Sequence, residues 1–305
     1  MKKVINFSKF FPVAVVISSV LILSGIVSVA FRGMNWGLEF KPGQNIQIQV
    51  SNVETNADSV LKVLTENNLK TEVKSVGDDN SQYQIRTSVD ENIENSIVSA
   101  LKKAYGNDNV SLVQSQSISA QFSVSLIRNS IVLVLLTLVL IFAYTMIRFK
   151  WDFALASVIA VIHDSLIMIA FLSWSQLEFT TTSIAAILTI IGYSINATVV
   201  ILDRIRSDMK IVEAKSFTDI VNSALTGTLS RSVITTVTTL FAVLALVVYT
   251  TGDIRNFAIS LIVGLLSGCY SSIFIAGAFI NKMRKNWKPV AVIPTSNVVK
   301  MEEQV

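Results

Sequence analysis

Long apolar runs recur along this chain, and one large polar block separates the first run from the rest. Six runs are long enough to matter, because an α-helix needs about 20 residues to cross roughly 30 Å of hydrocarbon. The pattern therefore predicts an α-helical polytopic membrane protein with six spans, interrupted by a polar segment at 32–125. The six predicted spans are 11–31, 127–147, 153–174, 180–202, 232–250 and 256–280.

The polar segment has its own alternation of patterns. Apolar residues repeat every second position in some stretches, which predicts strands, and every third or fourth position in others, which predicts helices. The strands are expected at 45–50, 70–76, 81–89 and 110–113, the helices at 56–67 and 93–105, and a turn at 77–80. The order βαββαβ predicts a small ferredoxin-like α+β domain, with an antiparallel sheet and two helices on one face. It contains no nucleophile–base pair and no glycine-rich phosphate loop.

Composition agrees with a membrane protein and argues against several other classes. Charged residues make up 15% of the chain, against about 25% in soluble domains. The net charge of +4 is small and scattered, so we expect no nucleic-acid binding. A single cysteine, Cys269, and a single histidine, His163, exclude an intrachain disulfide and a Cys/His zinc site. We therefore expect neither a metal nor a cofactor.

Lysine and arginine predict the orientation, because they are enriched in the short loops on the cytoplasmic side. They cluster before the first span and after the second, fourth and sixth, whereas the short loops on the other side hold only Arg255. Both termini are thus expected in the cytoplasm. The expected parts are 1–31 (N-terminus and first span), 32–125 (extracytoplasmic α+β domain), 126–281 (five-helix bundle) and 282–305 (basic cytoplasmic tail). The first run is too long for a signal-peptide core, so we expect it to be a retained span.

Small and polar residues form stripes along four of the spans. Membrane helices pack through small residues and buried hydrogen bonds, so we expect these stripes to face the interior of the bundle. Glycines within them, Gly192, Gly264 and Gly268, are expected to let helices approach closely. The stripes are Ala156, Ala160, His163 and Asp164; Thr182, Ala185, Thr189, Gly192 and Asn196; Arg231, Thr235, Thr238, Ala242 and Ala245; and Gly264, Gly268, Ser272 and Ala276.

Four residues are candidates for a proton pathway or a buried polar network: His163, Asp164, Asn196 and Arg231. Asp164 is predicted near the bilayer midplane, where an ionised carboxylate costs at least about 2.5–3.5 kcal/mol. It is either permanently hydrogen-bonded, to His163 or a hydroxyl, or a proton-relay or gating group. Asn196 either bridges two helices or lines a wet path. Arg231 either snorkels to the surface or balances a carboxylate.

Five segments together resemble the SecF family of protein-translocase subunits, in the RND transporter superfamily. The resemblance implies a six-span RND-type half bundle in the bacterial cytoplasmic (inner) membrane that promotes protein export with the proton-motive force. It implies SecD, the SecYEG channel, YajC, the translocating polypeptide and the lipid bilayer as partners. The segments are "FRGMNWGLEF", "IRFKWDFALASVIAVIHD", "GYSINATVVILDRIR", "LSRSVITTVTTL" and "GLLSGCYSSIFIA".

The chain departs from the family pattern in two places. After the first span the family reads Asp followed by Thr-Gly-Gly, whereas this chain has Glu39 and then Pro42 and Gly43. We expect the hinge to the external domain at these residues, with reduced freedom because Pro42 fixes its φ. The family also has an Asp, implicated in proton movement, after the motif Asn196, and here that position is Ala197.

Ala197 cannot carry a proton, and three explanations compete. SecD supplies the essential carboxylate, Asp164 substitutes for the missing acid, or the chain has lost proton coupling and acts as a scaffold; we favour the first. The expected function is therefore a non-enzymatic subunit of protein export. The alternatives are half of an RND-type exporter of small molecules or lipids, and a purely structural stabiliser of SecD. An intramembrane hydrolase is disfavoured, because His163 and Asp164 have no nucleophile at motif spacing.

Overall fold

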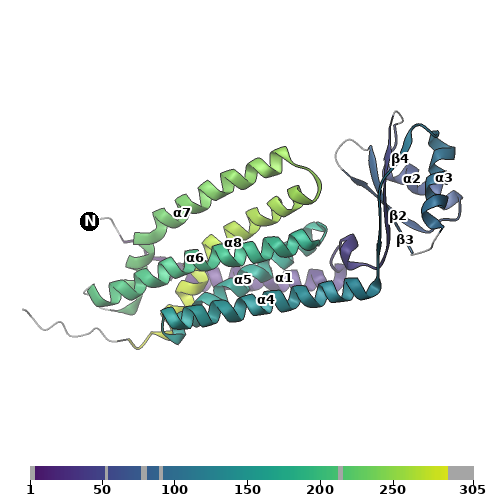
Figure 1. Ribbon diagram of the computed structural model, residues 1–305. Helices are drawn as coiled ribbons and strands as arrows, with labels where there is room; N and C mark the ends of the chain where they lie inside the picture. The colour runs from purple at the N-terminus through teal and green to yellow at the C-terminus, as the bar shows by residue number, and fades with distance from the viewer. Residues whose placement is uncertain (1–3, 52–53, 77–80, 89–91, 212–215, 288–305) are drawn as a thin grey trace, which may run out of the picture.

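The computed structural model describes residues 4–51, 54–76, 81–88, 92–211 and 216–287. Long helices lie side by side, and a small α/β domain stands at one end of them (Figure 1). Within these residues, six helices are long and apolar enough to cross a membrane, which confirms the predicted number of spans. The predicted turn at 77–80, Lys2 and Lys3, and the basic tail beyond residue 287 lie outside the described residues.

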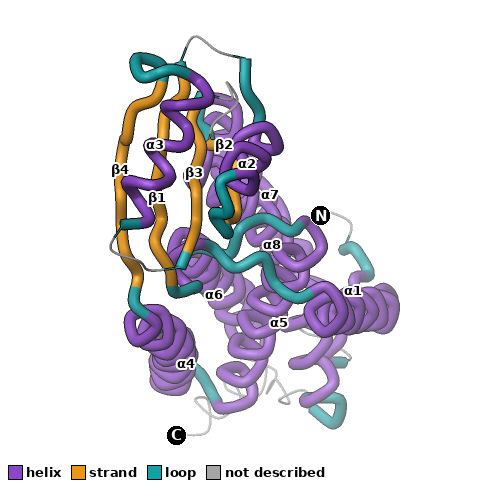
Figure 2. The backbone as a smooth tube through the Cα atoms, turned by 90° about the vertical axis from the view of Figure 1, so that its right-hand side faces the viewer, coloured by secondary structure: helices purple, strands orange, loops and turns teal. Residues whose placement is uncertain are grey.

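Two of the long helices, α5 and α8, form the centre of the bundle. Helix α5 packs against α1, α4, α6 and α8, and helix α8 packs against α1, α5, α6 and α7. Figure 2 shows α1 and α4 on opposite sides of α5. The bounds are α1 Phe11–Arg32, which follows the 3-10 turn Phe7–Phe10, α4 Ala120–Arg148, α5 Trp151–Ser175, α6 Thr181–Ile211, α7 Phe217–Tyr249 and α8 Gly252–Met283.

Helix α7 is longer than the predicted span, which began at residue 232. Its first turn is fixed by a capping box, in which the Ser216 and Asp219 side chains each accept a hydrogen bond from the other residue's backbone N–H. The added turns bury Phe217, Val221 and Ala224 against the bundle. These turns are amphipathic rather than uniformly apolar, so a search for apolar runs does not include them.

The α/β domain at one end of the bundle, called the external domain because it lies outside the long helices, has the predicted βαββαβ order. Its four-stranded sheet has the strand order β2-β3-β1-β4, and all neighbouring strands are antiparallel. Both helices cover the face of the sheet that is turned away from the bundle (Figures 1 and 2). The elements are β1 Gly43–Val50, α2 Ala57–Glu66, β2 Thr71–Val76, β3 Gln82–Thr87, α3 Ile93–Tyr105 and β4 Val110–Ile118.

A single hydrophobic core holds this domain together. Ile46 and Ile48 of β1, Tyr83 of β3 and Leu101 of α3 are all fully buried in one cluster. The side chains come from both layers, so the sheet and the helices need each other to remove these apolar groups from water.

The external domain joins the bundle without a flexible linker on its C-terminal side. Strand β4 ends at Ile118, and α4 starts at Ala120 with the Ser119 side chain accepting a hydrogen bond from the backbone N–H of Phe122. The domain boundary expected between 125 and 126 therefore falls inside α4. Because the helix is continuous, a movement of α4 is transmitted directly to the edge of the sheet.

Candidate functional site

Asp164 lies in the middle of α5 and is completely buried. Four groups contact its carboxylate. The hydroxyls of Ser194 and Ser271 donate to Oδ2 at 2.5 and 2.7 Å. The hydroxyl of Ser267 donates to Oδ1 at 2.6 Å, and Nδ1 of His163 lies 3.0 Å from the same oxygen.

These contacts use the hydrogen-bonding capacity of the carboxylate fully. Each oxygen has two partners, and a carboxylate has about four acceptor sites in total. Hydroxyl donors replace hydration in a place without water. Ser194 belongs to α6, and Ser267 and Ser271 belong to α8. The carboxylate therefore ties α5, α6 and α8 together at mid-depth of the membrane.

The second ring nitrogen of His163 continues the network toward α1. Nε2 lies 3.0 Å from the hydroxyl of Ser18, which also lies 3.1 Å from the Tyr270 hydroxyl. Tyr270 in turn donates to the backbone carbonyl of Ala14 at 2.7 Å. Ser18 can donate to a neutral imidazole, or accept from a protonated one while donating to Tyr270. The network thus accommodates both protonation states of His163 by turning one hydroxyl.

A crevice reaches this part of the network from one end of the bundle. It has a volume of about 410 Å³ and lies between α1, α5 and α8, with Ser18, His163 and Lys282 among its lining residues. Lys282 is in the last turn of α8, at the end of the bundle away from the external domain. The crevice thus borders the imidazole, whereas Asp164 is enclosed.

The stripes predicted on α6 and α7 do not face the interior of this chain. Helix α6 turns Ser194 and Thr198 inward instead, and the Thr198 hydroxyl lies 3.0 Å from that of Ser272. The interior is filled by α5 and α8, which leaves the stripes on the outside. The exposed stripe residues are Ala185, Thr189, Gly192, Asn196, Arg231, Thr235, Thr238, Ala242 and Ala245.

Asn196 and Arg231 therefore belong to an exposed face and are separate from the buried network. Among the described residues, none contacts the Asn196 amide or the Arg231 guanidinium by a hydrogen bond or an ion pair. The threonines of the face differ, because Thr189 and Thr235 bond to carbonyls of their own helices. A free amide in hydrocarbon costs several kcal/mol, so this face requires a covering that supplies polar partners. We call the surface formed by the exposed stripe residues of α6 and α7, including Asn196 and Arg231, the α6–α7 face.

The three predicted packing glycines fall into two groups. A Cβ atom at Gly264 would overlap the side chain of Ile190, and one at Gly268 would lie 3.3 Å from Cβ of Ser194. Both glycines therefore let α8 lie against α6. Gly192 has no atom within 4 Å of such a Cβ position. Among the described residues, Gly192 therefore has no close helix neighbour on its Cβ side, because it lies on the α6–α7 face.

The residues predicted as a hinge make defined contacts at the junction between the bundle and the external domain. Glu39 accepts hydrogen bonds from the backbone N–H and the hydroxyl of Thr181, at 2.8 and 3.0 Å, at the start of α6. A carboxylate is favourable there because a helix N-terminus carries unpaired N–H groups and a positive partial charge. Nearby, the N–H of Gly37 donates to the carbonyl of Phe179, and Lys74 of β2 pairs with Glu178.

Pro42 and Gly43 set the direction in which the chain enters the sheet. Gly43 has a φ of 153°, and a Cβ atom there would lie 2.7 Å from the carbonyl oxygen of Thr87. Only glycine fits this close approach. The carbonyl of Pro42 accepts a hydrogen bond from Arg86 at 3.1 Å. Of the three residues singled out as a hinge, Glu39 therefore contacts α6 of the bundle, whereas Pro42 and Gly43 contact β3 of the external domain.

Sequence reasoning found Asp164 and His163 but missed the groups that hold them. Those groups are Ser18, Ser194, Ser267, Ser271 and Tyr270. One signal was present: Ser267 and Ser271 are four residues apart on α8, hence on one face, beside Gly264 and Gly268.

The architecture defines an integral membrane protein of a transport class, with six spans, an external α+β domain after the first span and polar groups inside the bundle. Two family descriptions match the chain: the C-terminal region of protein export membrane proteins SecD/SecF over residues 71–286, and the SecD/SecF GG motif over residues 27–52. The chain belongs to the SecD/SecF family of protein export membrane proteins.

Individual relatives agree. The protein translocase subunit SecF of Borreliella burgdorferi is 35% identical over 303 residues, covering 94% of this chain and 100% of that protein. SecF of Treponema pallidum is 48% identical over 184 residues, 60% of this chain and 44% of that protein. The crystal structure of SecDF from Thermus thermophilus, a translocon-associated membrane protein, superimposes with a TM-score of 0.83 at 28% identity. The match covers 94% of this chain and 39% of SecDF.

Proposed function

We propose that this chain is an accessory subunit of the Sec preprotein translocase that works together with SecD in the bacterial inner membrane. Its relatives are translocase subunits, and the SecDF chain that it resembles is more than twice as long. The proposed role is mechanical and non-enzymatic: the chain promotes the export of polypeptides through the SecYEG channel. YajC is a further proposed partner. The external domain is the part proposed to meet the emerging polypeptide.

The α6–α7 face carries this proposal. It combines small residues, which allow close helix packing, with Asn196 and Arg231, whose side chains have no polar partner in the described part of the chain. Lipid tails offer no hydrogen bonds, so a second set of membrane helices is the covering that fits. Helices of SecD would complete the bundle here, with a SecD acid opposite Arg231 and a SecD polar group opposite Asn196.

The buried network is the proposed site of proton response. His163 can gain or lose a proton while its contacts to Asp164 and Ser18 are kept. Asp164 holds Ser194 on α6, and the outer end of the same helix holds Glu39 below the external domain. A change in the network would thus be passed along one rigid helix, about 20 Å from residue 194 to residue 181 at 1.5 Å per residue.

A second candidate function is a stabilising scaffold for SecD. The observation that favours it is the complete satisfaction of the Asp164 carboxylate by four partners. A fully bonded group holds helices together without any proton transfer. Ala197 fits this role as well, since α6 then contributes no titratable group beside Asn196.

The orientation is part of the proposal. The start of α1 and the end of α8 lie together at the end of the bundle away from the external domain (Figure 1). Arg204, Arg206 and Arg284 lie at that same end, on α6 and just after α8. Basic residues mark the cytoplasmic side, which supports cytoplasmic termini and an extracytoplasmic domain.

Export into inverted membrane vesicles tests the two functions against each other. Vesicles would contain the channel with this chain and SecD, with SecD alone, or with neither, and each would be assayed with and without a protonophore. The proposal predicts that the chain and SecD together raise export and that the protonophore removes the increase. A scaffold predicts an increase that survives the protonophore, provided that SecD alone is unstable. No increase from the pair would contradict both.

A further inference from the structure

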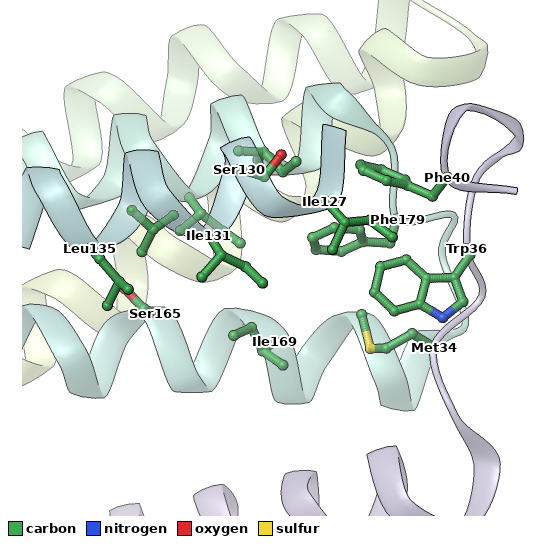
Figure 3. Close-up of a pocket in the computed structure, with 13 residues that line it drawn as sticks. Met34, Trp36, Phe40, Ile127, Ser130, Ile131, Leu135, Ser165, Ile169 and Phe179 are labelled. Carbon is green, nitrogen blue, oxygen red and sulfur yellow. The ribbon is translucent and has the colours of Figure 1, made fainter. Parts of the chain in front are cut away.

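An apolar groove lies between α4 and the rest of the bundle, near the external domain. Its volume is about 290 Å³, close to the lower limit of ligand pockets, which begin at roughly 300 Å³. Figure 3 shows Ile127, Ile131 and Leu135 of α4 on one side and Ser165 and Ile169 of α5 on the other. The end nearest the external domain is closed by the rings of Trp36, Phe40 and Phe179, whose centroids are 5.3–5.7 Å apart.

The lining accepts hydrocarbon and nothing polar. Its two hydroxyl groups are already used within their own helices, since Ser130 donates to the carbonyl of Leu126 and Ser165 donates to that of Val161. Water is therefore a poor occupant, because apolar cavities of this kind stay dry. An empty groove is also unfavourable, because its lining loses dispersion contacts.

The groove opens to the outside of the bundle. Ile131 and Leu135 line it and are each 56% exposed. In a bilayer this exposure is to lipid, at the depth where α1 ends and Trp36 begins the path to the external domain. The groove thus lies in the leaflet on the external side.

A basic residue, Arg128, lies on α4 beside the opening of the groove. Arg128 is exposed, lies three residues before Ile131 and seven before Leu135, and so continues their stripe on α4 outward by one turn. Its neighbour Ile127 lines the groove together with Met34 and Trp36, which puts Arg128 at the level of the membrane interface. Among the described residues, none forms an ion pair or a hydrogen bond with its guanidinium.

From this geometry we infer a binding site for one anionic phospholipid of the external leaflet. An acyl chain fills the groove between α4 and α5, and the phosphate pairs with Arg128. A guanidinium group is a well-suited hydrogen-bond donor to phosphate. The lipid would thus hold α4 apart from α5, and α4 directly follows β4, the edge strand of the external domain. This inference goes beyond the export role and does not depend on it.

Photolabelling tests the site. The full chain, purified with SecD, is placed in nanodiscs of phosphatidylethanolamine containing a small fraction of phosphatidylglycerol with a diazirine on one acyl chain. After illumination, labelled peptides are identified by mass spectrometry. We expect the label to concentrate on Ile131, Leu135 and Ile169 relative to Leu140, which is equally exposed on α4 but outside the groove.

Two variants separate the acyl and phosphate contacts. Arg128→Gln should lower groove labelling by phosphatidylglycerol about fivefold, the loss expected for one basic residue near an anionic lipid. It should lower labelling by a diazirine phosphatidylethanolamine less, because the ammonium of that headgroup offsets the charge of its phosphate. Ser165→Phe fills the groove and should remove both signals, with thermal unfolding confirming that each variant is folded.

Three results would overturn the site. Equal labelling of Leu140 and the groove would mean ordinary surrounding lipid only. Unchanged phosphatidylglycerol labelling in Arg128→Gln would remove the phosphate contact. Labelling that is present in the chain alone but absent with SecD would mean that a helix of the partner fills the groove.

Discussion

Asp164 shows how a membrane interior accommodates a carboxylate by supplying hydrogen-bond donors. Three serine hydroxyls and the His163 imidazole surround it at 2.5–3.0 Å. Each donor replaces part of the hydration that burial removes. Serine suits this task because its short side chain keeps the donor close to the helix axis, so α6 and α8 can approach α5 closely.

Asp164→Asn tests whether this carboxylate does more than hold helices. The amide keeps one acceptor but places an NH₂ group against hydroxyls, so we expect a loss of stability of about 2 kcal/mol, measured by thermal unfolding. If the network responds to protons, the protonophore-sensitive part of export should disappear while co-purification with SecD continues. Export that keeps its sensitivity to the protonophore would leave Asp164 with a structural role only.

Ser267→Ala is the matched control for that experiment. It removes one neutral hydroxyl from the same carboxylate and leaves the acid in place. We expect a loss of about 1 kcal/mol and export that still responds to the proton gradient. A loss of gradient response in this variant equal to that of Asp164→Asn would mean that the defect follows stability and not the charge.

At this scale, sequence located the acid and its histidine but not their surroundings. A charged residue within an apolar run is unusual, so Asp164 stands out in the sequence. Serines are common in membrane helices, and nothing local distinguishes Ser194 and Ser267, which reach the carboxylate, from Ser130 and Ser165, which bond to their own backbones. Only the rotation of each helix against its neighbours decides between these uses.

The contacts between helices depend on where glycine lies. Gly264→Leu would force its side chain into Ile190 of α6 and should destabilise the chain by about 1–3 kcal/mol. A Cβ atom at Gly192 has no described neighbour within 4 Å, so we expect Gly192→Leu to leave thermal unfolding in detergent unchanged. Its capture by SecD should fall, because position 192 lies on the α6–α7 face. A Gly192→Leu chain that is less stable by itself but is captured normally by SecD would contradict the assignment of Gly192 to the contact with SecD.

The link between Glu39 and α6 leads to a prediction about the external domain. Glu39→Gln weakens the contact with the helix N-terminus and should cost about 1 kcal/mol. The domain should then move more freely, which spin labels on the sheet and on α8 would report as a broader distance distribution. Glu66→Gln, an exposed acid at the end of α2, is the control. Identical distributions in the two variants would mean that Glu39 does not restrain the domain.

Among the elements, the number of spans and the order of the external domain could be predicted because each depends on a periodic or continuous pattern. The direction in which the stripes of α6 and α7 point could not be predicted. Small and polar residues indicate contact with a helix, but in a bilayer they do not say whether that helix belongs to the same chain. Gly264 contacts α6 within the chain, whereas Gly192, with the same signal, is exposed.

The whole molecule has two kinds of surface within the membrane. One kind is apolar, as on α4, where Val139 and Leu140 are 62% and 60% exposed. The other is the α6–α7 face, with Asn196 and Arg231. The first suits lipid and the second suits a protein partner. We therefore propose that this chain forms one half of a paired bundle, joined to SecD along the α6–α7 face.

Cross-linking from single positions tests the pairing with SecD along the α6–α7 face. Cys269 is replaced by serine, and single cysteines carrying a photoreactive maleimide are placed by Thr189→Cys and Thr238→Cys on the α6–α7 face, or by Leu140→Cys on α4 as the control. We expect illumination of native membranes to cross-link SecD to the chain from positions 189 and 238 and not from position 140. Cross-links to SecD from position 140, with none from positions 189 and 238, would contradict this pairing.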